Sequence, residues 1–349
     1  PTWGPGMRTF AWAPTGNTLA VNANIDGFGS LRLVDVEGDF EPVALARAWH
    51  LGIDWGVNGI IAARSGAKTP RQLVHYVDPQ PTRGTQTWRE PQRTVIAYGA
   101  PGGFRNLVEP AAVTWERDGV TLHGLWWEPT NVAGRAPVLV AMHGGPTDQA
   151  RADWDARRAY FVAQGWAVFA PNPRGSTGYG RAYADALAGQ WGVIDVEDVA
   201  AGIRTVVAQQ GADPSRVAVM GGSAGGYLAL RLAIEHPELL QAVISVYGVT
   251  DLAQLAAETW RFESGYIPWL AGTDAAVWRD RSPVHTAHRL RTPLLLLQGD
   301  ADVVVPLSQH AALLDALRAT GTPVESHIYE GEGHGWSGAE TVALTLVDV

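Results

Sequence analysis

The stretch RVAVMGGSAGGYLALRLAIEH, residues 216–236, contains an apolar strand, a glycine-rich turn and a predicted helix. Its centre fits the pattern G-x-S-x-G around Ser223, and this pattern occurs once in the chain. In such a turn the backbone is strained, the neighbouring residues must be small, and the helix N-terminus favours negative charge. The stretch therefore predicts an α/β fold that exposes Ser223 as a nucleophile. In the alternative interpretation, the glycines only allow the helix to pack closely on the sheet.

Strands and helices alternate on both sides of this turn. Buried-type strands are predicted at PVLVAMHGG (137–145), WAVFAPN (166–172), QAVISVYG (241–248), TPLLLLQGD (292–300) and VESHIYEG (324–331). A helix is predicted at residues 194–210, and a β-hairpin at residues 113–129 precedes the first of these strands. The alternation is typical of a mostly parallel sheet with helices on both faces. Because such sheets bind ligands beyond the carboxyl ends of their strands, we expect the functional residues there.

The chain up to about Asn106 has a different pattern, made of short strands and turns. Trp12 and Trp55 lie about 43 residues apart, and each is followed by a Gly-containing turn and an apolar strand. That spacing suits four-stranded propeller blades, with an irregular antiparallel sheet as the alternative. We therefore expect a β-propeller-like segment of about two blades at residues 1–106. A catalytic domain is expected at residues 107–349. Open blade edges would favour a homo-oligomer, or association with a missing propeller portion.

A serine needs a base to remove its proton, and the base needs a carboxylate to orient it. His334 follows the last predicted strand and lies in the glycine-rich loop EGEGHGW, so we expect it to be the general base. The strand at LLLLQGDADVVVP (294–306) ends in Asp300 and Asp302. We expect Asp302 to be the orienting acid because it lies further into the loop. Asp300, as a turn-capping residue, and Asp251, after an earlier strand, remain alternatives.

Attack on a carbonyl also requires N–H donors aimed at the new oxyanion. MHGGP (142–146) ends the strand before the first crossover, where the oxyanion loop of such a fold belongs. We expect the backbone N–H groups of Gly145 and Ala224 to be the donors, since Pro146 has none. His143 is expected to hold this loop rather than to take part in the reaction.

With these residues assigned, the chain resembles the prolyl oligopeptidase family of serine peptidases, and within it the acylaminoacyl-peptidase branch. The stretches that carry the resemblance are HGGP, NPRGSTGYGRAY, GGSAGGY, SPVHTAHRLRTPLLLLQGDADVVVP and EGEGHGW. They cover most of residues 107–340, in the family's order. The resemblance implies an α/β-hydrolase fold with Ser223 as nucleophile, Asp302 as orienting acid and His334 as general base. It also implies a preceding β-propeller that restricts access to short peptides.

The chain departs from this family pattern at both ends. Its blade-like segment is too short for a full propeller ring, and TVALTLVDV stops where the family's last helix would begin. The first residue is Pro1 and no signal peptide is visible. We expect the sequence to be part of a longer chain, in which the gating of substrate by a complete propeller cannot be assumed.

A substrate pocket is expected from the aromatic stretch ETWRFESGYIPWLAG (258–272), which would overhang the site. Core packing is the alternative interpretation of this stretch. The pocket candidates, which would favour an apolar side chain at the cleaved bond, are Trp260, Phe262, Tyr266, Ile267, Trp269, Val303 and Val304. In NPRGSTGYG (172–180), the glycines and Arg174 are expected to brace the oxyanion loop rather than to contact substrate.

Composition excludes several classes of protein. The chain has 349 residues, 46% hydrophobic and 17% charged, with a net charge of -9 that is spread without blocks. This balance argues against nucleic acid or anionic membrane surfaces as partners, and no apolar run approaches the roughly 20 residues of a membrane span. The absence of cysteine excludes disulfides and thiolate metal sites. We expect no metal or organic cofactor, because the pair His285 and His288 lacks the H-E-x-x-H pattern.

These observations favour a serine peptidase that hydrolyses short peptides or N-acylated aminoacyl amides through an acyl-enzyme on Ser223. An esterase or small-molecule amidase with the same three residues is the alternative, because both reactions share the acyl-enzyme. A catalytically inert binding scaffold is a third possibility, whose signature would be the loss of one of the three. A cytoplasmic location is expected.

Overall fold

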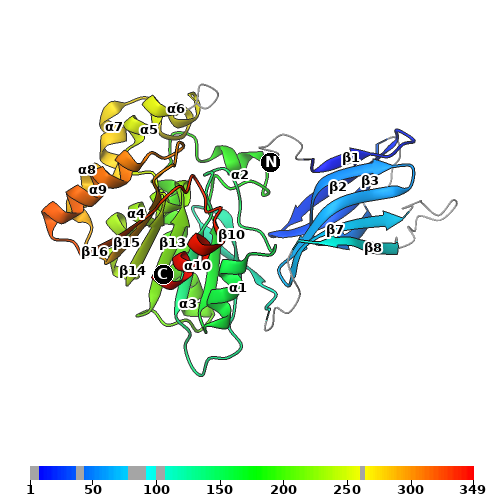
Figure 1. The fold of residues 1–349 in the computed structure, drawn as a ribbon, viewed down its shortest axis with the longest axis horizontal. Coiled ribbons are helices and arrows are strands. Elements are labelled where there is room, and N and C mark those ends of the chain that lie inside the picture. Colours follow the sequence, from blue (N-terminus) through cyan, green and yellow to red (C-terminus); the bar gives the residue numbers. More distant parts are fainter. Residues whose placement is uncertain (1–7, 37–42, 78–91, 100–106, 260–263) are drawn as a thin grey trace. The chain divides into compact units, whose positions relative to one another are not determined.

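The computed structural model describes residues 8–36, 43–77, 92–99, 107–259 and 264–349. The chain divides into two compact units (Figure 1). The first comprises residues 1–111 and 151–160, and the second comprises residues 112–150 and 161–349. The domain boundary after residue 106 that the sequence suggests stays a prediction.

The first unit contains two antiparallel sheets of four strands each. One sheet has the order β1-β2-β3-β4, formed by Phe10–Trp12, Thr18–Ile25, Phe28–Asp35 and Val43–Arg47. The other has the order β5-β6-β7-β8, formed by Trp49–Gly56, Gly59–Gly66, Thr69–Val77 and Gln92–Tyr98. Trp12 lies in the first strand of one sheet and Trp55 in the first strand of the other. The two tryptophan-centred sequence patterns therefore correspond to two four-stranded, blade-like sheets.

Alternation of side chains along the strands builds the core of this unit. In β6, Ile60 and Ala62 are fully buried, whereas Ile61 between them is 42% exposed. Leu31 and Leu33 in β3 show the same period of two and join Ile60 in one hydrophobic cluster. This is the pattern of a sheet with one face on a core.

The second unit is built on an eight-stranded sheet of order β16-β15-β14-β13-β11-β12-β10-β9. Its strands are β9 (Ala111–Arg117), β10 (Val120–Trp127), β11 (Val138–Met142), β12 (Ala167–Asn172), β13 (Val217–Gly222), β14 (Ala242–Val246), β15 (Leu294–Gly299) and β16 (Val324–Tyr329). The strands from β11 onward pair in parallel, and β10 pairs antiparallel with β12. The mostly parallel sheet expected from the sequence is confirmed.

Helices connect and cover these strands. They are α1 (Ala156–Ala163), α2 (Arg181–Asp185), α3 (Ile194–Gln209), α4 (Ala224–Glu235), α5 (Leu252–Glu258), α6 (Tyr266–Ala271), α7 (Ala275–Arg281), α8 (Pro283–Thr286), α9 (Leu307–Thr320) and α10 (Ala339–Asp348). The buried helix α4 packs against β13 and β14 and contacts α3, while α5, α6 and α7 form a group of their own (Figure 1). α10 is attached to β16 by a hydrogen bond from the Tyr329 hydroxyl to Asp348, 2.6 Å long.

The parallel strands bring distant parts of the chain to one edge of the sheet. β11 ends at Met142, β13 at Gly222, β15 at Gly299 and β16 at Tyr329. Because the carboxyl ends of parallel strands lie at the same edge, the loops after these strands meet there. All of the expected catalytic and oxyanion-hole residues lie in these loops or at the first residues of α4.

Candidate active site

Ser223 occupies a sharp turn between β13 and α4. Its φ and ψ angles are 57° and -124°, in a region that non-glycine residues rarely adopt. Its backbone N–H donates to the carbonyl of Val246 over 3.0 Å, and its side chain makes no capping hydrogen bond to the helix. The serine is half-buried, while Ala224 next to it is buried. The turn therefore holds the Ser223 hydroxyl at the edge of the sheet without using it for the helix.

The glycines around Ser223 are required by close backbone contacts. A Cβ atom at Gly225 would lie 2.7 Å from the carbonyl oxygen of His143, and one at Gly221 would overlap the Gly225 carbonyl. Both contacts are tighter than real side chains show, so larger residues would push α4 away from β11 and β13. The glycines thus serve close packing, and this packing places the loop after β11 beside the turn. The packing role of the glycines is thus observed, and the role of Ser223 as a nucleophile stays a prediction.

Asp302 and His334 form a hydrogen-bonded pair at the same edge. His334 Nδ1 lies 2.8 Å from Asp302 Oδ2. The other carboxylate oxygen of Asp302 accepts from the N–H groups of Val304 and Val305, over 2.8 and 2.9 Å. Burial alone would raise the pKa of Asp302, but the hydrogen bonds from His334 and from these two N–H groups outweigh it and lower the pKa. An ionised carboxylate only accepts, so His334 Nδ1 is the donor in this hydrogen bond, and Nε2 is the acceptor of the corresponding neutral tautomer.

The two alternative acids have other partners. Asp300 Oδ1 accepts from the N–H of Gly331 over 2.6 Å, which makes it the turn-capping residue that the sequence suggested. Asp251 is the N-cap of α5 and accepts from the N–H groups of Ala253 and Gln254. The geometry favours Asp302 over both.

The loop after β11 lies against the turn that carries Ser223. A Cβ atom at Gly144 would be 3.7 Å from the Cβ of Ser223. Gly145 has φ of 116°, and a Cβ there would lie 2.7 Å from the N–H nitrogen of Asp148, so this position requires glycine. The structure thus brings the loop that contains Gly145 to the start of α4, where Ala224 lies. This is the arrangement that two oxyanion donors need, and their assignment remains a proposal.

His143 holds this loop together, as expected from the sequence. Its Nδ1 lies 2.8 Å from the carbonyl oxygen of Gly144, so Nδ1 is the donor there. Its Nε2 then accepts from the hydroxyl of Ser176, 2.9 Å away. The N–H of Thr177 donates to the carbonyl of Asp148 over 2.9 Å. Ser176 and Thr177 therefore hold the loop after β11 directly, and the bracing role expected of the glycines and Arg174 stays a prediction.

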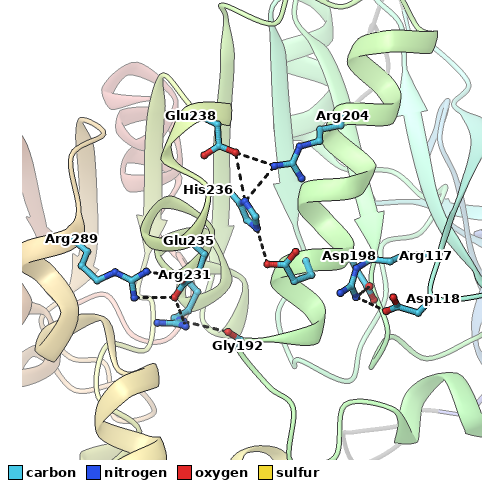
Figure 2. A network of polar contacts seen from close by, with 11 residues as sticks. Arg117, Asp118, Gly192, Asp198, Arg204, Arg231, Glu235, His236, Glu238 and Arg289 are labelled. Atoms are coloured by element: carbon cyan, nitrogen blue, oxygen red, sulfur yellow. Dashed lines mark hydrogen bonds and ion pairs between the residues drawn. The ribbon is translucent and has the colours of Figure 1, made fainter.

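Arg174 holds the segment that contains Ser176 and Thr177. It donates to both carboxylate oxygens of Asp198 on α3, over 2.9 and 2.6 Å, and Asp198 is fully buried. These hydrogen bonds raise the pKa of Arg174. Arg117 reaches the same carboxylate over 3.1 Å and also pairs with Asp118 (Figure 2). Breaking such a buried pair leaves an uncompensated charge, so the group fixes residues 172–180 on α3.

A second ionic group fixes the helix behind Ser223. Arg231 on α4 is 4% exposed and pairs with Glu235 over 2.8 Å, and its Nε donates to the carbonyl of Gly192 (Figure 2). Arg289 joins Glu235 from the other side, over 2.6 Å. The helix whose N-terminus faces the candidate site is therefore anchored along its buried face.

The residues expected to line a substrate pocket divide into three groups. Trp260 and Phe262 lie outside the described residues. Ile267 is 5% exposed and packs with Leu187 and Trp191, so it belongs to the hydrophobic core, which was the alternative interpretation of this stretch. The remaining four are partly or largely exposed: Tyr266, Trp269, Val303 and Val304.

Tyr266 has a contact that its sequence position did not reveal. Its hydroxyl lies 2.7 Å from Thr147 Oγ1 and donates to the carbonyl of Gly145 over 3.3 Å. Its ring is parallel to that of Trp269, with centroids 6.1 Å apart. α6 is thereby attached to the oxyanion loop, which places its aromatic face beside the candidate site.

Three further residues near the site were missed by sequence reasoning. Glu332 accepts from the N–H groups of Ser337 and Gly338 and so closes the loop that contains His334. Tyr247 contacts the His334 ring. Asp195 lines a small cavity with His143 and Ala224, and burial raises its pKa to about 7. In the sequence, the signal for Glu332 was an acidic residue two positions before the expected base. The positions of Tyr247 and Asp195 depend on packing between distant segments, which the sequence does not show.

The described ranges lack two kinds of feature. No cluster of three or more His, Cys, Asp or Glu side chains there is arranged to hold a metal ion. No helix in this part of the chain has the length and apolarity of a membrane span.

Comparison with known sequences identifies relatives of much of the chain. The chain is 33% identical over 287 residues to the acylamino-acid-releasing enzyme of Rattus norvegicus, an alignment that covers 78% of this chain and 39% of the relative. The corresponding enzyme of Sus scrofa is 31% identical over 238 residues, which are 64% of this chain and 32% of that protein. The matched residues therefore cover well under half the length of these relatives.

Comparison with solved structures agrees. The crystal structure of a puromycin hydrolase matches with a TM-score of 0.87 and 33% identity, over 99% of this chain and 53% of that one. A puromycin-hydrolyzing peptidase of Mycobacterium tuberculosis matches with a TM-score of 0.85 and 31% identity, over the same shares. The fold is thus an α/β-hydrolase unit preceded by part of a β-propeller. The family model described as "Prolyl oligopeptidase family" matches residues 152–346, more than half of the chain. The chain belongs to the prolyl oligopeptidase family of serine peptidases.

Proposed function

We propose that this chain carries the catalytic machinery of a serine peptidase that cleaves short peptides or N-acylated aminoacyl amides through an acyl-enzyme on Ser223. The observation that carries the proposal is the 2.8 Å hydrogen bond from His334 Nδ1 to Asp302 Oδ2, at the same sheet edge as the turn of Ser223. It leaves His334 Nε2 as the acceptor that a serine hydroxyl requires.

In the proposed reaction, Ser223 Oγ attacks the substrate carbonyl while His334 Nε2 takes the hydroxyl proton. The ionised Asp302 stabilises the imidazolium that forms and holds the ring in the right tautomer. The N–H groups of Gly145 and Ala224 stabilise the oxyanion, with a contribution of about 3 kcal/mol for each donor. His334 then gives the proton to the leaving amine, and water, activated by the same histidine, releases the acyl group.

The substrate side of the proposal rests on the relatives and on the exposed apolar surface near the site. The rat and pig relatives are named for the release of acylamino acids, and two solved relatives for the hydrolysis of puromycin. Tyr266 and Trp269 on α6, with Val303 and Val304 after β15, are proposed to form an apolar pocket for the side chain of the acyl residue. A small-molecule amidase is the second candidate, favoured by the puromycin-hydrolysing relatives.

Ser223→Ala tests the function. We expect a loss of kcat/KM of about 10⁶-fold on N-acetylated aminoacyl p-nitroanilides, because the acyl-enzyme cannot form. The matched control is Ser308→Ala, an exposed serine whose loss we expect to change kcat/KM by less than about twofold. Free aminoacyl p-nitroanilides, p-nitrophenyl esters and puromycin, assayed in parallel, separate the peptidase from the esterase and the small-molecule amidase. Ester turnover without amide turnover would contradict the peptidase proposal.

The assembly of the chain and its cytoplasmic location also remain proposals. We propose that the blade-like sheets of the first unit associate with further propeller blades or with a second copy, because open sheet edges invite pairing. Light scattering at several protein concentrations tests the second-copy case.

A further inference from the structure

Tyr247 has a backbone conformation that tyrosine rarely adopts. It follows β14 directly and has φ of 39°, in the left-handed region. Its N–H donates to the carbonyl of Leu297 in β15 over 2.7 Å, which fixes the backbone in this conformation. Bulky residues occur there as outliers, and such outliers gather at functional sites. The position of the Tyr247 side chain therefore requires a strained backbone.

The strained backbone places the Tyr247 ring between two parts of the candidate triad. Its ring centroid lies 4.7 Å from that of His334, with the planes at 54°. A Cβ atom at Gly222, the residue before Ser223, would lie 2.8 Å from the Tyr247 ring. The ring thus contacts both the base and the turn that carries the nucleophile, which are more than a hundred residues apart in the sequence.

Trp336 supports the same ring from its edge. The centroids of Tyr247 and Trp336 are 5.1 Å apart at 77°, and those of Trp336 and Tyr329 are 5.0 Å apart at 68°. Edge-to-face pairs of this kind fix ring orientation beyond simple burial. Tyr329 belongs to β16, so the aromatic series connects the sheet to the imidazole.

We propose that Tyr247 is a positioning residue that fixes the imidazole of His334 relative to Ser223, an inference that rests on the proposed function. The hydrogen bond to Asp302 ties down Nδ1 of His334 but leaves the ring free to tilt about that bond. A rigid aromatic ring against the imidazole removes this freedom and keeps Nε2 directed at the serine. Misplacement of a catalytic group by about 1 Å costs about 100-fold in rate.

The test is kinetic and uses the full chain. In Tyr247→Gly we expect kcat on the p-nitroanilide substrate to fall about 100-fold while KM changes less than about threefold. Glycine relieves the strain at positive φ but also removes the ring contacts with His334 and Trp336, so we expect a lower melting temperature and measure kcat well below it. Tyr247→Phe keeps the ring, so its kcat should stay within about threefold of the wild type. Asp26→Gly is the matched control, with φ of 52° in the β2–β3 turn, and its kcat should not change.

A purely structural role predicts a different pattern. The proposal is overturned if Tyr247→Gly keeps the wild-type kcat, or if it loses activity only in proportion to a lower melting temperature. Tyr247→Asn, which also tolerates positive φ, should show the same loss of kcat and replaces the glycine variant if that chain does not fold. Labelling with a fluorophosphonate separates the two proposals. An unlabelled, folded wild type overturns the function and the Tyr247 proposal together, whereas equal labelling rates of wild type and Tyr247→Gly overturn only the second.

Discussion

The turn that carries Ser223 and the loop that carries His334 are held in place by different forces. The turn is shaped by van der Waals contact between backbones, since side chains at Gly221 and Gly225 would collide with neighbouring carbonyls. The loop after β16, residues 330–338, is shaped by carboxylates. Glu332 accepts from Ser337 and Gly338, and Asp300 accepts from Gly331. The position of Ser223 thus depends on the absence of neighbouring side chains, and the position of His334 depends on charged ones.

This difference determines how each region fails. A backbone contact has no titratable group, so the turn should respond to added volume and not to pH. The base loop should tolerate changes of volume better, but it should weaken when its carboxylates are neutralised.

Asp302→Asn removes the charge that accepts the hydrogen bond of His334, the proposed base. We expect kcat/KM to fall about 10⁴-fold, because an amide at this position favours the wrong tautomer of His334. Asp300→Asn is the matched control in the same loop. It keeps an acceptor for the N–H of Gly331, so the loss should stay below about threefold. Equal losses in the two variants would argue that the loop needs acid groups generally and that Asp302 has no special role.

Gly225→Ala tests the steric side of the comparison. The added Cβ would lie 2.7 Å from the carbonyl oxygen of His143, so α4 must move away from the oxyanion loop. We expect the free energy of unfolding to fall by about 1–3 kcal/mol and kcat/KM to fall about 100-fold at every pH. Urea denaturation and pH–rate profiles measure both. Gly56→Ala, where a Cβ meets nothing within 4 Å, is the control. A loss that depends strongly on pH would contradict the steric explanation.

Glu332→Gln tests the electrostatic side, with the smallest expected effect, about tenfold in kcat. Hydrogen bonds from the Ser337 N–H, the Thr341 hydroxyl and the Gly338 N–H lower the pKa of Glu332 to about 2. Its stabilising contribution is therefore complete above the ordinary pKa of 4.5 and is lost as the pH falls towards 2. The difference in the free energy of unfolding between wild type and Glu332→Gln should be largest above pH 4.5. It should shrink as the pH falls from 4.5 towards 2.

Urea denaturation of both proteins between neutral and acidic pH measures this difference. Glu330→Gln, a neighbouring exposed glutamate, should leave stability and rate unchanged. A stability difference between wild type and Glu332→Gln that is the same at every pH would show that the carboxylate charge is not what closes the loop.

The parts of the site that the sequence predicted are those decided by local rules. The turn around Ser223 needs small neighbours whatever the rest of the fold does, so its glycines were visible as a pattern. Asp302 and His334 could be chosen because parallel strands bring their carboxyl ends together. The two blade-like sheets followed from the spacing of Trp12 and Trp55, each of which is followed by a Gly-containing turn and an apolar strand.

The parts that the sequence did not predict are decided by packing between distant segments. The same aromatic stretch contains Ile267 in the core and Trp269 at the surface, and composition does not distinguish them. Tyr266 was expected in a pocket, and its hydroxyl bond to Gly145 depends on how α6 meets the loop after β11. The positive φ of Tyr247 is invisible in the sequence, because tyrosine is an unfavourable choice for it.

Mapping a fluorophosphonate adduct by mass spectrometry tests the central claim most directly. After reaction of the wild-type chain and digestion, the account predicts a single adduct on Ser223, formed much more slowly in Asp302→Asn. An adduct on any other residue, or no adduct in a folded wild-type chain, would contradict the assignment of Ser223, Asp302 and His334 as one catalytic unit.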